Sequence, residues 1–220
     1  MGQAATSPSP APSGRERHDA GRTRIAILAA ARTVLLQEGY ARLSTRSVAE
    51  AADVPLSQIH YHFGSKQQLI LAVLAAQTGR LLERQASMYA GPEPLWVRWE
   101  RACAFLEIDL ESGYVRILQE LIAAGWSDPE LAASVREQIG GWFDLLTTVV
   151  QRTSDTIGGL EPFTPAEVAA LMGLTFLGAE SAILLGMTEA QLPARAALAK
   201  VGQVIREIET RHTEEVPDGH

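Results

Sequence analysis

The sequence predicts an all-α chain of about nine helices. It divides into a small N-terminal three-helix domain containing a helix-turn-helix and a larger helical domain. Apolar residues recur at the three- and four-residue spacing of helices along most of the chain. Alternation of apolar and polar residues, which half-buried strands show, nowhere extends beyond a few residues. At 220 residues the chain is long enough for one sizeable core or two small domains.

The chain begins with an expected arm and a long helix. Residues 1–20 are rich in Pro, Ser and Ala, which predicts a disordered arm. The apolar stripe that includes Ile27 predicts a helix over about residues 23–38. Gly39 is expected to end this helix, because glycine readily takes the left-handed conformation found there.

Residues 44–66 predict two short helices with a tight corner between them and the start of a longer helix. Ser44 is expected to cap the first short helix through its hydroxyl. Asp53 lies at the corner, and Ile59 and Phe63 are apolar anchors one turn apart on the second short helix. This arrangement is that of a helix-turn-helix, whose second helix fits a major groove.

Six further helices are expected over about residues 66–87, 95–111, 114–124, 128–152, 164–185 and 193–211. Ser65, Ser127 and Thr164 are the expected N-caps of three of them. The segment 164–185 is apolar on nearly all sides, so it must be covered on all sides, and a partner subunit is the expected cover. Residues 212–220 predict a disordered acidic tail.

The net charge of −7 is distributed unevenly. Residues 1–66 carry 8 basic against 5 acidic side chains (+3), and residues 67–220 carry 11 against 21 (−10). A positive front and an acidic body favour an oriented approach to a polyanion. We expect no transmembrane helix and no signal peptide, because no run of 18 apolar residues and no apolar leader exist. The single Cys103 excludes an intramolecular disulfide and favours the cytoplasm.

Residues 22–74 resemble the DNA-binding domain of TetR-family transcriptional regulators. The resemblance rests on RIAILAAARTVLLQEGY, on LSTRSVAEAA, on the corner Val54-Pro55 and on HYHFGSKQQL. It implies a DNA-binding domain over residues 21–67 and a helical effector-binding and dimerisation domain over 68–211. It also implies a homodimer that packs residues 164–185 and 193–211 of each subunit together, and that reads a palindromic operator.

The resemblance further implies the DNA-contacting positions. Thr45 and Arg46 fall in a first helical turn, where backbone N–H groups favour a phosphate. The expected set is Thr45, Arg46, Leu56, Ser57, Gln58, His60, Tyr61, His62 and Lys66. Leu56 is expected at a thymine methyl group, and the next polar residues of the helix at base edges. The arm either has no role or brings Arg15, Arg17, Arg22 and Arg24 to DNA.

His60 and His62 also raise the alternative of a metal site. Residues two apart on a helix point in different directions, and no cysteine or carboxylate completes a ligand set. We therefore expect neither a metal nor a cofactor.

The body of such regulators usually holds a small-molecule pocket. The expected lining is Trp96, Trp99, Cys103, Tyr114, Leu118, Trp126, Trp142, Phe143, Met172 and Phe176. The alternative is plain core, since aromatic residues at helical spacing are commonly buried for packing alone. Glu120 and Glu180 interrupt apolar runs. Each binds a cationic ligand, or else faces solvent or an arginine across the dimer; glutamate's usual exposure favours the second interpretation.

The resulting hypothesis is a ligand-responsive DNA-binding repressor that a small, largely apolar effector releases from its operator. One alternative is a DNA-binding activator or scaffold controlled by a protein partner. Another is an all-α enzyme. We expect no enzyme, because the chain has no Gly-rich phosphate loop, HExxH motif, nucleophile elbow or credible Cys–His arrangement.

Overall fold

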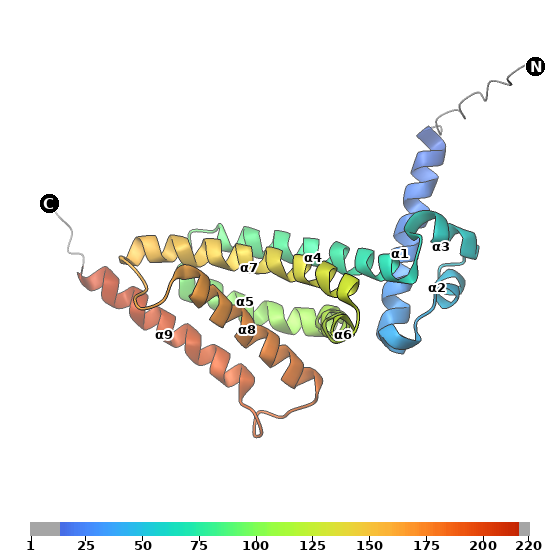
Figure 1. The fold of residues 1–220 in the computed structure, drawn as a ribbon. Helices are drawn as coiled ribbons and strands as arrows, with labels where there is room; N and C mark the ends of the chain where they lie inside the picture. Colours follow the sequence, from blue (N-terminus) through green and yellow to red (C-terminus); the bar gives the residue numbers. More distant parts are fainter. Residues whose placement is uncertain (1–13, 216–220) are drawn as a thin grey trace, which may run out of the picture. The chain divides into compact units, whose positions relative to one another are not determined.

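The computed structural model describes residues 14–215, and these residues form nine helices and no strand. The all-α prediction is confirmed. The helices are α1 (Gly14–Arg42), α2 (Thr45–Ala51), α3 (Leu56–Phe63), α4 (Lys66–Tyr89), α5 (Leu95–Ser112), α6 (Tyr114–Gly125), α7 (Pro129–Ile157), α8 (Pro165–Leu184) and α9 (Ala194–Glu215) (Figure 1). They fall into two compact units, residues 1–73 and 74–220, which are described separately below.

The first helix starts earlier than the sequence suggested. Residues 14–20, expected to belong to a disordered arm, are the opening turns of α1, and the rest of the arm lies outside the described residues. Arg, Glu and Ala are good helix formers, so a helix that is already nucleated extends readily through them. The backbone leaves the helical conformation at Gly39, with φ 78°, so the helix breaks where glycine predicted it.

The first unit is a small bundle around one core. α1 packs on α2, and α2 packs on α3. Its fully buried side chains include Ile27, Leu35, Leu43, Val48, Ile59, Leu69 and Ile70. These residues come from all four helices and from the α1–α2 connection, so the small α2 and α3 are held by shared burial rather than by their own length.

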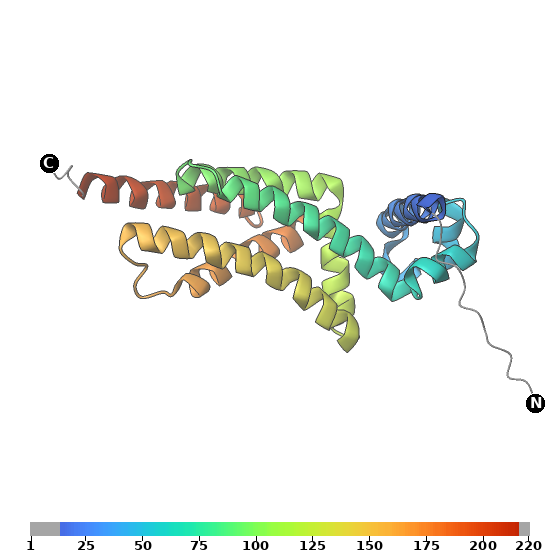
Figure 2. The ribbon, with the colours of Figure 1, turned by 90° about the horizontal axis from the view of Figure 1, so that it is seen from above.

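The second unit consists of the rest of α4 and the helices α5 to α9. α7 lies against α8 and α5 lies against α9, while α6 crosses between the end of α5 and the start of α7 (Figure 2). Its core includes Trp99, Leu106, Leu146, Ala169 and Phe176. Both α7 and α9 end later than expected, α7 at Ile157 and α9 at Glu215; the rest of the predicted tail lies outside the described residues.

Close helix approach depends on two glycines. A Cβ atom at Gly202 of α9 would lie 2.9 Å from Cδ1 of Trp99 on α5. At Gly173 of α8 a Cβ atom would overlap the ring of Phe143 on α7. In both places an aromatic ring occupies the volume that a side chain would take, which fixes how the two helix pairs pack.

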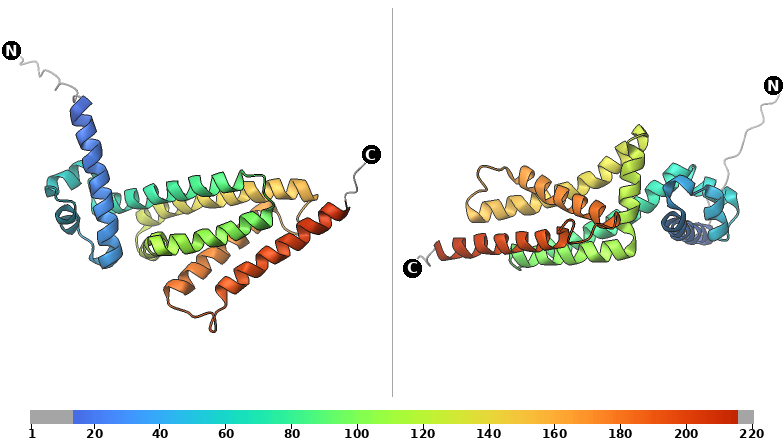
Figure 3. Two further views of the ribbon diagram at one scale, coloured as in Figure 1. Left: turned by 180° about the vertical axis from the view of Figure 1, so that it is seen from behind. Right: turned by 90° about the horizontal axis from the view of Figure 1, so that it is seen from below.

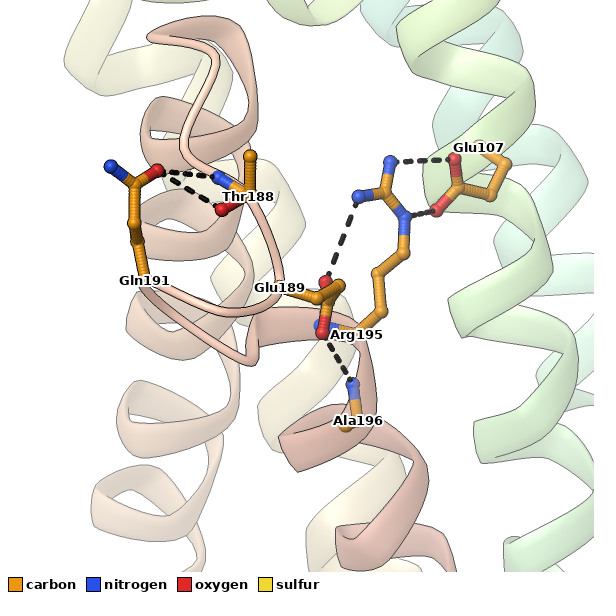
Figure 4. A network of polar contacts seen from close by, with 6 residues as sticks. All are labelled: Glu107, Thr188, Glu189, Gln191, Arg195 and Ala196. Carbon is orange, nitrogen blue, oxygen red and sulfur yellow. Dashed lines mark hydrogen bonds and ion pairs between the residues drawn. The ribbon is translucent and has the colours of Figure 1, made fainter.

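Residues 185–193 connect α8 to α9 (Figure 3). Polar contacts hold this connection in place. Arg195 at the start of α9 pairs with Glu107 of α5, with 2.6 Å between Nε and Oε1, and also lies 3.8 Å from Glu189 (Figure 4). Gln191 accepts hydrogen bonds from the backbone N–H and the hydroxyl of Thr188. These contacts anchor the beginning of α9 to α5.

α8 leaves part of its apolar surface uncovered. Leu171 and Leu174 are more than half exposed, and Gly178 on the same face has open space beside it. α8 is also long and apolar enough to cross a membrane by length and composition alone, a property that core helices share. On α9, a parallel stripe of Val201, Val204 and Ile208 is exposed as well.

Candidate DNA-binding surface and effector cavity

The start of α2 is fixed by a reciprocal cap. The hydroxyl of Ser44 accepts a hydrogen bond from the backbone N–H of Ser47 (3.0 Å), and the hydroxyl of Ser47 accepts one from the N–H of Ser44 (3.2 Å). The sequence predicted the Ser44 cap, and the structure adds its partner. The next residues of the helix, Val48 and Ala49, are buried and seat it on α1.

The corner between α2 and α3 requires an unusual backbone. Asp53 has φ 52°, a left-handed conformation that aspartate tolerates better than most residues. The N–H of Val54 then donates to the carbonyl of Ala49 (3.0 Å), which closes the turn. Pro55 precedes α3 and provides no side-chain cap, which is compatible with a first turn whose N–H groups have no helical partner.

α3 presents two different faces. Ile59 is fully buried and Phe63 is 9% exposed, so this face holds the helix on the core of the unit. On the other face Ser57, His60 and Tyr61 are exposed, with Tyr61 at 77%. Three polar side chains at positions i, i+3 and i+4 therefore form one outward surface.

The remaining positions expected to contact DNA differ in exposure. Arg46 is exposed and Thr45 is half-buried at the start of α2. On α3, Leu56, Gln58 and His62 are half-buried. His62 packs edge-on against the ring of Tyr61, and its Nε2 atom is buried without a hydrogen-bond partner.

Lys66 is engaged within the first unit. Its ammonium donates to the carbonyl oxygen of Tyr40 (2.7 Å) and lies 4.7 Å from the centre of the Tyr40 ring. Partial burial lowers the pKa of Lys66. The residue thus ties the start of α4 to the chain after Gly39. Among the basic residues of the predicted arm, Arg24 lies over the ring of Phe63, 5.2 Å from its centre, and Arg22 is exposed; the side chains of Arg15 and Arg17 lie outside the described part.

The second unit contains a cavity between α4, α5, α6, α7 and α8. It encloses about 40 Å³, room for a few water molecules. Its lining residues are Leu81, Gln85, Tyr89, Ala102, Leu106, Asp109, Tyr114, Leu118, Gln138, Ile139, Trp142, Leu146, Phe176, Leu177 and Glu180. Four of the ten expected pocket residues are among them: Tyr114, Leu118, Trp142 and Phe176.

Polar contacts order several lining side chains. The indole Nε1 of Trp142 donates to Oε1 of Gln85 (2.9 Å), and the hydroxyl of Tyr114 lies 3.3 Å from that of Thr78. Burial raises the pKa of Tyr114 to about 12, so its phenol is neutral at physiological pH. These contacts fix the positions of Trp142 and Tyr114 in the cavity lining.

Two carboxylates line the cavity. Asp109 pairs with Arg84, with 2.6 Å between Oδ2 and Nη2. Glu180 is only 9% exposed, and its Oε2 accepts a hydrogen bond from Nε2 of Gln119 at 3.3 Å. Burial raises the pKa of Glu180 to about 7; the bond from Gln119 lowers it, and the charge of Asp109 raises it further. The expectation that Glu180 faces solvent is wrong, whereas Glu120 pairs along α6 with Arg116.

The other six expected pocket residues lie elsewhere. Trp99 is buried in the core and donates from Nε1 to the carbonyl of Leu198 (2.8 Å). Trp126 is 83% exposed, and Trp96 lies under the guanidinium of Arg206. Cys103 and Met172 pack against the core cluster, and Phe143 covers Gly173.

Asp109, Gln85 and Gln138 line the cavity although the sequence did not predict them there, and Glu180 was expected there only as the less favoured alternative. A signal was available, because Asp109 continues the buried stripe of Ala102 and Leu106 at helical spacing. Burial raises the pKa of Cys103 to about 11, so this thiol is unreactive at neutral pH. No group of three or more His, Cys, Asp or Glu side chains with metal-binding geometry occurs among the described residues.

Comparison with known proteins identifies the first unit. Residues 27–73 match the family model described as bacterial regulatory proteins, tetR family. No curated protein sequence matches the chain significantly. The matched segment runs from α1 through the helix-turn-helix into α4, so it covers the surface described above.

Solved structures share the fold along most of their length. A TetR-family transcriptional regulator from Agrobacterium tumefaciens aligns with a TM-score of 0.69 at 18% identity, covering 86% of this chain and 98% of that one. The regulator FadR from Bacillus subtilis, solved with stearoyl-CoA, aligns with a TM-score of 0.70 at 15% identity, covering 82% and 96%. A protein from Saccharomonospora viridis, described as a transcriptional regulator and solved with choline, aligns with a TM-score of 0.67 at 18% identity, covering 82% and 95%.

Proposed function

We propose that this chain, whose residues 27–73 match the tetR family model, is a cytoplasmic TetR-family repressor that binds a palindromic operator as a homodimer and leaves it when a small, largely apolar effector binds. The observation that carries the proposal is the outward surface of α3. Ser57, His60 and Tyr61 are exposed there while Ile59 and Phe63 hold the helix from behind. The family's members are regulators rather than enzymes, so we propose no catalysis.

The proposed roles on DNA follow from exposure and chemistry. Ser57 and His60, with the half-buried Gln58, read base edges, and Leu56 meets a thymine methyl group. Arg46, exposed in the first turn of α2, binds a phosphate together with Thr45. Tyr61 and His62 contact phosphates in this proposal. Lys66 donates one N–H to the carbonyl of Tyr40, and its other two N–H groups contact phosphates as well.

The homodimer is proposed to form through the exposed apolar faces of α8 and α9. A face with Leu171, Leu174 and Gly178 on α8 and the stripe of Val201 and Val204 on α9 are covered when two copies pack around a two-fold axis. Two recognition helices then fall about one DNA turn apart, roughly 34–36 Å.

The effector is proposed to enter the cavity of the second unit. About 40 Å³ is far less than the roughly 300 Å³ or more of a typical ligand pocket. A larger molecule therefore binds only a conformation in which the lining has rearranged. Release from DNA requires the effector to bind one conformation more tightly than the other in this way. α4 carries Leu81, Gln85 and Tyr89 into that lining and begins in the DNA-binding unit, so it is the element through which we propose the coupling.

The proposal is tested by sequencing genomic DNA retained by the purified protein and footprinting the recovered fragments. An inverted repeat protected over two half-sites one helical turn apart is the expected result, and genes beside it indicate candidate effectors. Protection of a single half-site, or of no defined sequence, contradicts operator binding by a homodimer. Operator binding that no small molecule in a broad panel weakens points instead to control by a protein partner.

A further inference from the structure

We propose that the effector cavity is built for an organic cation, an ammonium ion on an apolar or aromatic body, with the carboxylate of Glu180 as its counter-ion. The inference rests on the proposed function in one respect only, namely that the cavity is where the effector binds. Similar solved structures hold ligands as different as stearoyl-CoA and choline, so the ligand class is inferred from the charges and surfaces of this chain alone.

The charges of the cavity lining do not balance when Glu180 is ionised. Asp109 is already neutralised by Arg84 at 2.6 Å. Glu180 forms no ion pair in the part of the chain that the structure describes, and its hydrogen bond comes from the neutral amide of Gln119. When Glu180 is ionised, the cavity therefore holds one uncompensated negative charge, which a monovalent cation neutralises.

An ionised Glu180 without a counter-ion is energetically unfavourable. Glu180 is 9% exposed and sits on α8 between residues that pack in the core. An isolated buried carboxylate is strongly disfavoured and takes up a proton instead. Burial accordingly raises the pKa of Glu180 to about 7. A carboxyl group that sits near its midpoint at physiological pH ionises readily when a cation arrives.

The surface around the carboxylate is aromatic and apolar. Tyr89, Tyr114, Trp142 and Phe176 line the same cavity, and aromatic faces attract cations electrostatically. Leu81, Leu106 and Leu118 supply apolar area for the body of the ligand, as does Leu177. An anion, by contrast, meets two carboxylates and no unpaired basic group among the lining residues.

Binding must then depend on pH. The titratable groups that face Glu180 are Asp109 of α5, which is held by Arg84 of α4, and Tyr114 of α6. Tyr89 of α4 also lines the cavity, and burial raises the pKa of both tyrosines to about 12, so neither changes charge near neutrality. Glu180 is thus the group that releases a proton when the cation binds, and affinity rises with pH up to about 7 and then levels off.

The test uses three probes of similar shape on the full-length protein: phenethylamine (a cation), 2-phenylethanol (neutral) and 3-phenylpropionate (an anion). Isothermal titration calorimetry at pH 8 is expected to show the amine binding at least about tenfold more tightly than the alcohol, and the anion more weakly than both. From pH 6 to pH 8 the affinity of the amine is expected to rise about tenfold. Equal binding of amine and alcohol, preference for the anion, or no binding of the amine at millimolar concentration each overturns the proposal.

Glu180→Gln keeps the shape of the side chain and removes its charge. The variant is expected to bind the amine at least about tenfold more weakly and the alcohol with an affinity within about twofold of the unaltered protein. The affinity for the amine should no longer depend on pH. Glu120→Gln removes a carboxylate from the Arg116 pair outside the cavity and is expected to behave as the unaltered protein. Glu180→Asp retains the charge, so it is expected to keep the preference for the amine even if packing changes. An unchanged amine affinity in Glu180→Gln overturns the assignment.

Failure of this inference is distinguishable from failure of the proposed function. If the amine binds through Glu180 but the complex with the recovered operator stays intact, the cavity is a cation site and the effector role is wrong. If a neutral or anionic compound releases the operator while the amine series does not bind, the regulator stands and the cation assignment is wrong.

Discussion

Replacing Glu180 with glutamine is expected to stabilise the protein at pH 8 by about 3 kcal/mol. The structure raises the pKa of this carboxyl from its ordinary 4.5 to about 7, and each pKa unit corresponds to about 1.4 kcal/mol. Ionising Glu180 therefore costs about 3 kcal/mol more in the folded protein than in the unfolded chain. A glutamine carries no charge to desolvate, and its amide can still pair with Gln119.

The sign of the pH dependence follows from proton counting. Between pH 4.5 and pH 7 the folded protein holds a proton on Glu180 that the unfolded chain has released. Folding is thus favoured at low pH, and this contribution disappears as the pH rises through the folded pKa. The difference in unfolding free energy between Glu180→Gln and the unaltered protein is expected to grow in favour of the variant from pH 5 to pH 8.

Urea denaturation followed by far-ultraviolet circular dichroism measures this difference at several pH values, at one fixed protein concentration because the protein is proposed to be a dimer. Glu120→Gln serves as the control, since its carboxylate pairs with Arg116 on α6 and is not part of the cavity. If the difference in unfolding free energy between Glu180→Gln and the unaltered protein is the same at pH 5 and at pH 8, the burial argument is refuted.

Three further predictions concern DNA, the dimer and the core. Arg46→Ala is expected to weaken operator binding at low salt and to reduce the slope of log affinity against log salt by about one, measured by fluorescence anisotropy; an unchanged slope contradicts a phosphate contact. Gly178→Leu adds a side chain to the exposed face of α8 and is expected to weaken the dimer by about 1–3 kcal/mol while the monomer stays folded; sedimentation that still shows an intact dimer contradicts the interface. Gly202→Ala forces a Cβ atom to within 2.9 Å of Trp99 and is expected to cost about 1–3 kcal/mol of unfolding free energy. Gly140→Ala, a helical position with open space, is the matched control and is expected to gain about 0.5–1 kcal/mol.

Local signals predicted the helices well because helix caps depend on neighbouring residues. Thr164 is the N-cap that the sequence predicted, and the structure adds Glu167 as its reciprocal partner. At α7 the prediction was wrong in detail: Asp128, rather than Ser127, is the N-cap, and its carboxylate accepts from the N–H groups of Glu130 and Leu131. Ser127 and Asp128 are both suitable N-cap residues. Which of them caps the helix depends on the backbone of the preceding turn, which sequence patterns do not specify.

The cavity was harder to predict because periodicity gives a buried face and does not say what that face meets. Trp99 and Trp142 both lie on apolar stripes, yet Trp99 fills the core against α9 and Trp142 lines the cavity. Trp126 follows α6 directly and points into solvent. Glu180 interrupts an apolar run, and sequence alone cannot distinguish a solvent-facing glutamate from a buried one on a helix that is apolar nearly all round.

The packing of Trp99, a residue of α5, against α9 affects how two copies of the chain would meet. Its indole occupies the space beside Gly202 and donates to the carbonyl of Leu198, one helical turn earlier. α9 therefore cannot slide or rotate along α5 without losing both contacts. Since Val201 and Val204 are exposed on the same turns of α9, this ring also helps to set the direction in which they point. The geometry of the proposed dimer, and with it the spacing of the two DNA-reading helices, would then be dictated from inside each subunit, so a substitution in the core could alter operator choice without touching DNA.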